Sequence, residues 1–426
     1  MWFDEWTCLA LLGFVTIVIG VLAVFLWRKT HDIGFPLGIA FFYYFSLYGS
    51  WALVIDYLAG SSYEKYFYLF EKVIPLAIDS YYLKALLLYS TFLIVLELCL
   101  LKWVTGRKPS LPRRRYLVSS LTLALIAFFS VGCSFLIERG DIFAAFDEGV
   151  SAYSVTREFH PLFTLHQILN RTALLSSCLG VAIELSGGTA IYCVARTSLF
   201  ARILLSLSFG LSFLFPFFLG NKNELLFAMV GGILFYLANN ARAKLSRIIL
   251  IFAICVPVIS SIDGFRSLPA DEIYRGFSDS EFMEASLLSF LRSNETIAAH
   301  MSMYGVLVSE IPLTYGTSFL SLLASVVPRL IWEERPEQIY EYYARGISAI
   351  EGQGYSIHHA TGWYLNFGIL GVVLGAICFA GFWAFFFNRS RSIERYPRRW
   401  QILLSVTAPC FIVAGIPPFV RAGPEA

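Results

Sequence analysis

Charged side chains are scarce in this chain. Asp, Glu, Lys and Arg together make up only 15% of its 426 residues, whereas 57% are hydrophobic. A soluble protein of this length would carry roughly 25% charged residues. The composition therefore excludes a chain of two or three soluble domains and indicates an integral membrane protein. The formal net charge of +2 is uninformative by itself, because the basic residues are unevenly distributed along the chain.

Sequence motifs of nucleotide-binding, hydrolytic and metal-binding proteins are also missing. The sequence has no GxxxxGK[ST], HExxH, GxSxG or CxxC, and it has no internal repeat or low-complexity tract. Its eight cysteines each lie inside an apolar run, which favours buried hydrophobic roles over a zinc site or a disulfide framework. We therefore expect no metal, no cofactor and no nucleic-acid partner.

Long apolar runs dominate what is present. A helix needs about 20 apolar residues to cross roughly 30 Å of hydrocarbon. Only helices satisfy their backbone polar groups at such a density of spans. The sequence thus predicts an all-α polytopic membrane protein of about ten to eleven transmembrane helices, with a large, partly helical external loop. Ten spans are expected near 6–27, 35–58, 82–104, 116–137, 172–195, 198–220, 224–240, 248–262, 362–387 and 400–419.

These spans group into one functional unit with three parts. We expect an N-terminal bundle of eight helices over 1–262, a large periplasmic loop over 263–361, and C-terminal helices over 362–426. The closing IPPFVRAGPEA leads us to expect a trimmed chain with one further span after Arg421. The first span is expected to be retained, since Asp4 and Glu5 replace the basic start of a signal peptide.

Basic clusters fall on alternate loops and so define one side of the membrane. By the positive-inside rule that side is cytoplasmic, the N-terminus is external, and the long loop 263–361 is external as well. Within the loop, 295–312 is predicted as a moderately amphipathic helix, and 316–332 is apolar enough to enter the outer leaflet. The clusters are Arg28-Lys29, 105–115, Arg196 with Arg202, 241–247 and 388–400.

The external loop contains arginine but no lysine. Guanidinium groups clamp phosphates in a bidentate manner, so an anionic ligand at the membrane surface is one interpretation. Pairing with the many acids of the same loop is the other. The six arginines are Arg266, Arg275, Arg292, Arg329, Arg335 and Arg345. Lys222, in a tight external turn between two spans, is either a solvated turn residue or a further phosphate contact.

Two adjacent histidines precede the ninth predicted span. His358 and His359 are followed by Trp363 and Tyr364, which are typical of an interfacial belt. Imidazole exchanges protons near neutrality and suits general acid–base catalysis. The alternative is that one histidine caps the span. We expect the cap for one of the pair and a functional role for at least one. Metal binding is disfavoured, because neighbours on a helix point in different directions and no third ligand is evident.

Two further polar features have alternative interpretations. The loop 138–160, with Tyr153 and Arg157, could bind sugar rings by aromatic stacking or could simply be a polar loop. Glu184 interrupts a predicted span. It is either an intramembrane functional carboxylate or the end of that helix, where Ser-Gly-Gly follows.

Two stretches resemble the bacterial oligosaccharide repeat-unit polymerases, the Wzy-type or O-antigen polymerase-like family. VVPRLIWEERPEQIYEYYARG (326–346) is similar to the family's "pPR.iW..kP" element, and TGWYLNFGILGVVLG (361–375) is similar to its aromatic-x-Asn-Phe-Gly-x-x-Gly element. LGNKNELLFAMVGG (219–232) resembles its "GsRg.ll" turn, with Lys222 where arginine is commoner. Members often carry a Glu before the second element; here the region contains His358 and His359 instead.

The resemblance implies a membrane-embedded, lipid-sugar-dependent glycosyltransferase of the bacterial inner membrane. Such an enzyme joins undecaprenyl-pyrophosphate-linked oligosaccharide units at the periplasmic face for O-antigen, capsule or exopolysaccharide. The bilayer holds its lipid tails, and a chain-length regulator and a flippase are expected partners. His359 or His358 would be the catalytic base, and Trp363, Tyr364, Tyr153 and Arg157 would contact sugars. The implied pyrophosphate contacts are Arg329, Arg266, Lys222, Arg345 and Arg421.

Two other functions fit the same sequence. An O-antigen-ligase-like transferase would share the chemistry but use a lipid A acceptor. A lipid-linked oligosaccharide flippase or other transporter would differ in class. Transporters tend to have paired broken spans and charges at mid-membrane, whereas the candidate charges here gather at the external side.

Overall fold

The computed structural model describes residues 2–32, 34–58, 78–106, 120–148, 163–185, 199–218, 280, 294–319, 338–349 and 356–391. Within these ranges the chain is mostly helical and contains no strand, as the sequence predicted. The chain divides into two compact units. The first comprises 1–108, 292–395 and 415–426, and the second comprises 109–291 and 396–414.

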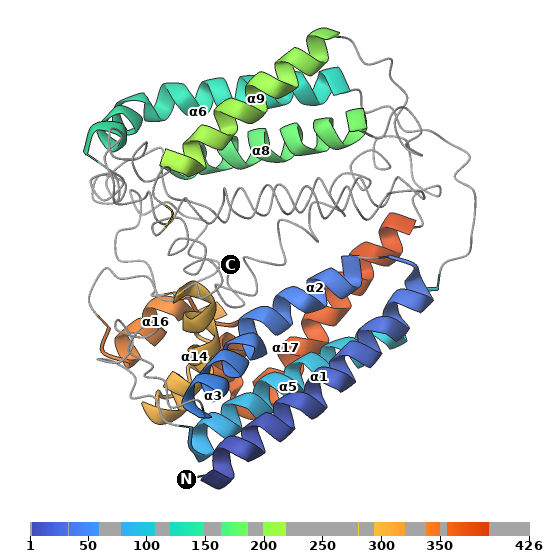
Figure 1. Ribbon diagram of the computed structural model, residues 1–426, viewed down its shortest axis with the longest axis vertical. Coiled ribbons are helices and arrows are strands. Elements are labelled where there is room, and N and C mark those ends of the chain that lie inside the picture. The colour runs from blue at the N-terminus through green and yellow to red at the C-terminus, as the bar shows by residue number, and fades with distance from the viewer. Residues whose placement is uncertain are drawn as a thin grey trace. The chain divides into compact units, whose positions relative to one another are not determined.

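The first unit is a helical bundle drawn from both ends of the chain (Figure 1). Helix α5 packs against α1 and along α17, and α14 packs against η1, α5 and α3. Its elements are α1 (Trp2–Thr30), α2 (Gly34–Tyr43), the π-helical turn η1 (Tyr44–Tyr48), α3 (Gly49–Leu58), α5 (Ser80–Trp103), α14 (Asn294–Val308), α16 (Ile339–Gly346) and α17 (His359–Arg391).

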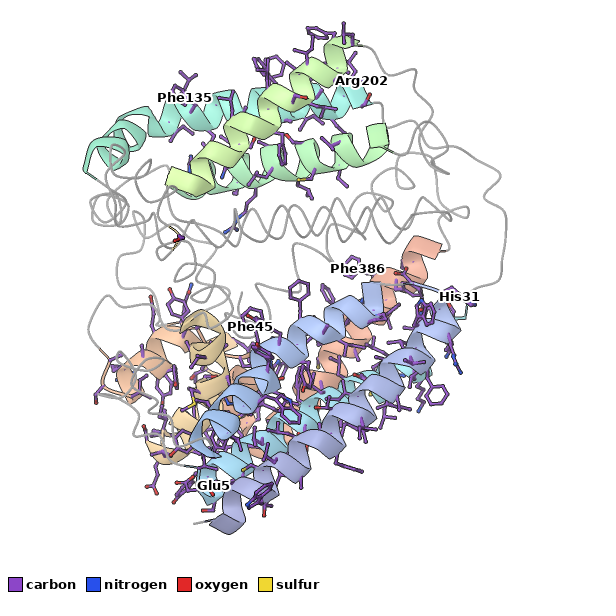
Figure 2. The ribbon with its side chains drawn as sticks, in the orientation of Figure 1. Glu5, His31, Phe45, Phe135, Arg202 and Phe386 are labelled. Atoms are coloured by element: carbon purple, nitrogen blue, oxygen red, sulfur yellow. The ribbon has the colours of Figure 1, made fainter. Side chains whose placement is uncertain are left out.

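Hydrogen bonds join the basic ends of three of these helices. The Lys29 ammonium at the end of α1 donates to the Leu101 carbonyl of α5 over 2.5 Å. The Asn388 side chain near the end of α17 donates to the Trp103 carbonyl and accepts from the backbone N–H of Thr105. Figure 2 shows Glu5 and His31 at opposite ends of α1. Thus α1, α5 and the latter part of α17 run in the same direction, and their basic ends share one side, as predicted.

The lengths of the helices suit a multi-pass membrane protein. Among the described residues, four helices are long and apolar enough to cross a bilayer: Glu5–Thr30, Ser80–Trp103, Ser120–Ile137 and His359–Arg389. The expected span 35–58 is also continuously helical over 34–58, although its middle turn is the π-helical η1. Three expected spans, 224–240, 248–262 and 400–419, lie outside the described residues.

In the second unit, three helices pack on one another: α6 (Ser120–Glu148), α8 (Phe163–Leu185) and α9 (Leu199–Phe218). The buried Ser134 hydroxyl of α6 lies 2.8 Å from the Nδ1 atom of His166 in α8. Close packing of α8 on α9 depends on Gly180, since a Cβ placed there would overlap the Leu205 side chain.

Two helix boundaries in this unit differ from the sequence prediction. Helix α8 includes residues 163–171, which precede the expected span 172–195, and Glu184 is helical. Residues 186–195 lie outside the described residues, so both interpretations of Glu184 stay predictions. Helix α6 continues to Glu148, so the first part of the expected loop 138–160 is helical. Charged residues there did not end the helix, because helical hydrogen bonds are made within the backbone.

Candidate functional site

Helix α17 is broken near its start. Phe367 (φ −137°, ψ 17°) and Gly368 (φ +62°, ψ −146°) have non-helical backbone angles and separate two helical segments. The first segment covers residues 359–366 and the second covers 369–391. The conformation of Gly368 is one that residues with a Cβ rarely adopt, which explains the glycine at this position in the sequence.

The two segments fold back on each other as a hairpin. A Cβ placed on Gly371 would overlap the Trp363 carbonyl oxygen, and one placed on Gly375 would overlap the Trp363 indole. At 1.5 Å per residue, a straight helix would separate Trp363 from these glycines by about 12 and 18 Å. The expected span 362–387 lies within α17, which is a candidate membrane span, but the break divides it. The second segment, 369–391, is about 34 Å long and is by itself long enough to cross a bilayer.

Asn366 holds the hairpin closed against the segment that follows α14. Its Oδ1 accepts hydrogen bonds from the hydroxyls of Thr314 (2.8 Å) and Ser318 (2.9 Å), and its Nδ2 donates to the Gly362 carbonyl (2.9 Å). The Leu365 carbonyl, which has lost its helical partner at the break, accepts the Thr314 N–H over 2.8 Å. Backbone polar groups freed by the break are thus satisfied inside the protein, as an apolar surrounding requires.

The hairpin moves both histidines away from the mouth of the span. The ring of His359 lies 5.3 Å from that of Phe379, which is about 16 Å along the second segment from Gly368. His358 is fully buried and His359 is 4% exposed. Both rings are therefore enclosed by protein and are not exposed at the surface of the bundle.

His358 caps the first segment of α17. Its Nδ1 accepts the Ala360 N–H over 3.1 Å, and its carbonyl accepts the N–H groups of Thr361 and Gly362. This confirms the expectation that one of the pair is a cap. Since Nδ1 accepts, the neutral ring carries its proton on Nε2, which is a buried atom. Burial, helped by His359 and His300, holds the pKa of His358 well below its ordinary value.

His359 is held by its own helical segment and by aromatic rings. Its Nε2 accepts the indole N–H of Trp363, one turn later, over 3.1 Å. Its ring packs against Phe92 of α5 and Phe379 of the second segment. Trp363, expected to contact sugar, therefore uses its polar atom to orient His359. Tyr364, the other expected sugar contact of this segment, is partly buried.

A third histidine, His300 of α14, completes a polar cluster. Its Nδ1 lies 2.6 Å from the Ser46 carbonyl in η1. A carbonyl only accepts, so Nδ1 carries the proton and Nε2 is the acceptor. Nε2 faces the hydroxyls of Tyr82 (2.7 Å) and Ser50 (3.1 Å). Burial lowers the pKa of His300 to about 4, so the ring is neutral at physiological pH.

Tyr89 and Ser302 connect this cluster to the cap of α17. The Tyr89 hydroxyl lies 2.9 Å from the His300 carbonyl and 3.2 Å from the hydroxyl of Ser302. The Ser302 oxygen accepts the His358 N–H over 3.0 Å and lies 2.8 Å from the Thr361 hydroxyl. A continuous polar network therefore runs from η1 through α14 and α5 to α17. We call these residues the histidine network: Ser46, Ser50, Tyr82, Tyr89, His300, Ser302, His358 and Thr361.

Sequence reasoning missed His300, Tyr82 and Tyr89. They lie on segments expected to be a surface helix and a plain membrane span. Helix α14 was expected to be amphipathic, but every residue over 297–307 is buried, so that expectation is wrong. A small-residue stretch with Ala298, Ala299, Ser302 and Gly305 was the available signal, because small residues allow close packing of helices.

The expected cationic residues are mostly outside the described part of the chain. Arg345 is described: it is exposed at the end of α16, with its guanidinium 5.4 Å from the Tyr342 ring centroid. Tyr342 in turn donates to the Pro312 carbonyl. The described residues contain no group of three or more metal ligands. The expected site residues that lie outside the described part of the chain are Arg266, Arg329, Lys222, Arg421, Tyr153 and Arg157.

Comparisons with known proteins leave the chain without an identified relative. No protein-family model, no curated protein and no solved structure matches it.

Proposed function

We propose that this protein is a membrane-embedded glycosyltransferase that polymerises undecaprenyl-pyrophosphate-linked oligosaccharide repeat units at the periplasmic face of a bacterial inner membrane. One observation carries the proposal. The Asn366-Phe367-Gly368 and Gly371 element, on which the family resemblance rests, forms the hairpin turn, and the hairpin packs His359 against Phe379, next in the chain to His358 of the histidine network. A motif kept for membrane insertion alone would not need this turn.

The proposed chemistry assigns different roles to the two histidines. His359 is the proposed acid–base group that takes the proton of the acceptor sugar hydroxyl. His358, which caps the segment through Nδ1, is a positioning residue. The atom Nε2 of His359 accepts the Trp363 indole N–H, so proton transfer at Nε2 requires the indole to move away. Trp363 therefore governs access to this atom.

Cationic groups would stabilise the pyrophosphate leaving group. Departure of undecaprenyl pyrophosphate develops negative charge on its oxygens, and guanidinium groups can neutralise this charge without a metal ion. The proposed residues are Arg329, Arg266, Lys222, Arg345 and Arg421. Arg345 lies on α16, which packs against α17, so it belongs to the same unit as the histidine network.

The test is polymerisation by the purified protein in nanodiscs. A lipid-linked oligosaccharide containing several sugars would be supplied as the only substrate. The proposal predicts chains of two or more repeat units together with released undecaprenyl pyrophosphate. It predicts loss of both products in His359→Gln, with normal product in a Gly20→Ala control. Hydrolysis without chain growth, or no reaction with any repeat-unit substrate, would contradict it. Addition of lipid A as acceptor separates a ligase-like transferase from a polymerase.

Two observations favour a second candidate, a transporter of lipid-linked oligosaccharides. Discontinuous spans are a recurring feature of transporters, and α17 is one. In addition, Glu97 is a buried carboxyl inside the α5 span, the kind of residue that marks ion or proton pathways. Vesicles containing the protein and a fluorescent lipid-linked oligosaccharide provide the test. Faster quenching of the fluorescence by an external quencher would support this candidate. Unchanged protection of the labelled lipid from the quencher would exclude it.

A further inference from the structure

Glu97 lies in the apolar layer of the bundle, away from the histidine network. It is on α5, six residues before Trp103 and eight residues after Tyr89. These separations correspond to about 9 Å and about 12 Å along the helix. The side chain is fully buried, and both of its carboxyl oxygens lack a hydrogen-bond partner. No step of the proposed function uses this residue.

The described helices packed on α5 offer Glu97 no basic partner. In α1, the only titratable side chain between Trp6 and Trp27 is Cys8, and in the second segment of α17 before Asn388 it is Cys378. The remaining titratable groups on elements that pack against α5 are those at the ends of α1 and α17, those of α14 and four phenols, and none of them is hydrogen-bonded to Glu97. They are Asp4, Glu5, Arg28 and Lys29 of α1, Glu295 and His300 of α14, and His359, Tyr364, Arg389 and Arg391 of α17. The phenols are Tyr43, Tyr44, Tyr48 and Tyr304.

Residues of α5 itself do not neutralise the charge of an ionised Glu97 either. Lys102 follows Glu97 by five positions, which places it about 140° around a helix of 3.6 residues per turn. Lys102 is exposed whereas Glu97 is buried, so the two side chains leave opposite sides of α5. Cys99 is half-buried and two positions away, hence also on another face. An ionised carboxylate in this surrounding would be desolvated without an opposite charge, which is strongly unfavourable.

We propose that Glu97 is a proton-binding site: in the folded protein at neutral pH it holds one proton and is a neutral carboxylic acid. The ligand is a proton, and the site is a single carboxyl in the half of the bundle that contains the basic helix ends. This site is independent of the glycosyl transfer proposed above. It gives the protein a protonatable group inside the membrane that a transferase does not need and that a proton-linked transport step would use.

Infrared difference spectroscopy of the full-length protein in nanodiscs tests the proposal. A carboxylic acid has a C=O stretch above the amide I band, whereas a carboxylate absorbs below it. The wild type minus Glu97→Gln spectrum should contain the carboxylic acid band, which should shift in D₂O. The band should persist from about pH 5 to about pH 8, where an ordinary Glu has lost its proton.

Glu341→Gln is the matched control. The Glu341 side chain accepts the backbone N–H of Gln338 at the start of α16, and the wild type minus Glu341→Gln spectrum should lack the carboxylic acid band assigned to Glu97. If the Glu97→Gln difference spectrum contains only carboxylate bands, Glu97 is ionised and the proposal is overturned. Should Glu97→Gln fail to fold, wild-type protein labelled with ¹³C in glutamate replaces it: a high-frequency band that shifts with the label supports the proposal, and its absence overturns it.

Discussion

The imidazole of His359 and the phenyl ring of Phe379 pack together with their centroids 5.3 Å apart, although twenty residues separate them within α17. In a straight helix this separation would be about 30 Å. The turn at Phe367 and Gly368 brings them together. The same turn encloses both histidines beside α5 and α14. The candidate site therefore exists only because α17 is folded back.

Gly368→Ala is expected to destabilise the protein through the backbone alone. A Cβ at this position would meet only the Leu313 side chain, at an ordinary 3.6 Å, but φ is +62°. Strain of this kind costs about 1–3 kcal/mol. Thermal unfolding in detergent measures this loss of stability. Gly20→Ala is the matched control, since a Cβ there meets nothing within 4 Å in the middle of α1. Equal stability of the two variants would contradict the assigned turn.

Asn366→Ala should open the hairpin, because it removes the acceptor of the Thr314 and Ser318 hydroxyls and the donor to the Gly362 carbonyl. Asn366 is fully buried. Polar groups left unpaired in a buried place cost about 1–3 kcal/mol, and we expect a loss of that size in the free energy of unfolding. Asn388→Ala, which removes a similar set of bonds at an exposed helix end, should cost less. A larger loss in Asn388→Ala would argue against this account.

Tyr89→Phe should loosen the histidine network without changing the shape of the core. The hydroxyl it removes lies within 3.2 Å of Ser302 and Thr361 and accepts the N–H of Met303. We expect a destabilisation of about 1–3 kcal/mol and faster hydrogen exchange in α14. Tyr81→Phe is the control, since Tyr81 is 44% exposed on the same helix. Similar exchange in both variants would show that the Tyr89 hydroxyl does not hold α14.

Stability should fall in acid because of His300. Burial lowers its pKa from 6.5 to about 4, so between these values the unfolded chain binds a proton that the folded chain does not. The stabilisation is complete above about pH 6.5 and is lost as pH falls toward 4, by roughly 3 kcal/mol in total. Unfolding measured at several pH values checks this. His300→Gln should flatten the pH dependence over this window, and an unchanged pH profile in that variant would contradict the assignment.

Much of the helical architecture could be predicted from the sequence. Apolar runs near 20 residues located α1, α5 and α9 within a few residues, because span length is fixed by bilayer thickness. Alternating basic clusters predicted the shared end of α1, α5 and α17, which the Lys29 and Asn388 contacts confirm. Hydropathy could not reveal the break in α17, because the run that contains Phe367 and Gly368 is apolar enough overall to be predicted as one span.

The candidate site was predictable only in part. The motif around Asn366 and the adjacent histidines drew attention to the correct segment, and the cap at His358 was anticipated. The partners of these histidines come from segments far away in the sequence. His300 and Tyr82, for instance, meet only through the packing of α14 on α5. Helix α14 was misjudged because its polar residues were taken to face water, whereas they bond to other buried groups.

Disulfide formation between residues 363 and 375 tests the fold-back of α17 most directly. A Cβ on Gly375 would touch the Trp363 Cγ, so the two Cβ atoms fall within reach of a disulfide, about 3.5–4.5 Å. The experiment uses Trp363→Cys with Gly375→Cys in a protein whose eight native cysteines are replaced. Oxidation followed by a maleimide mass tag counts the free thiols.

The control pair is Gly13→Cys with Phe25→Cys, which has the same spacing in the unbroken α1. The account predicts that oxidation removes both thiols of the 363/375 pair and neither thiol of the control, whose positions lie about 18 Å apart. If both thiols of the 363/375 pair stay reactive while the protein remains folded, α17 is a straight span. In that case the histidine network is not assembled as described.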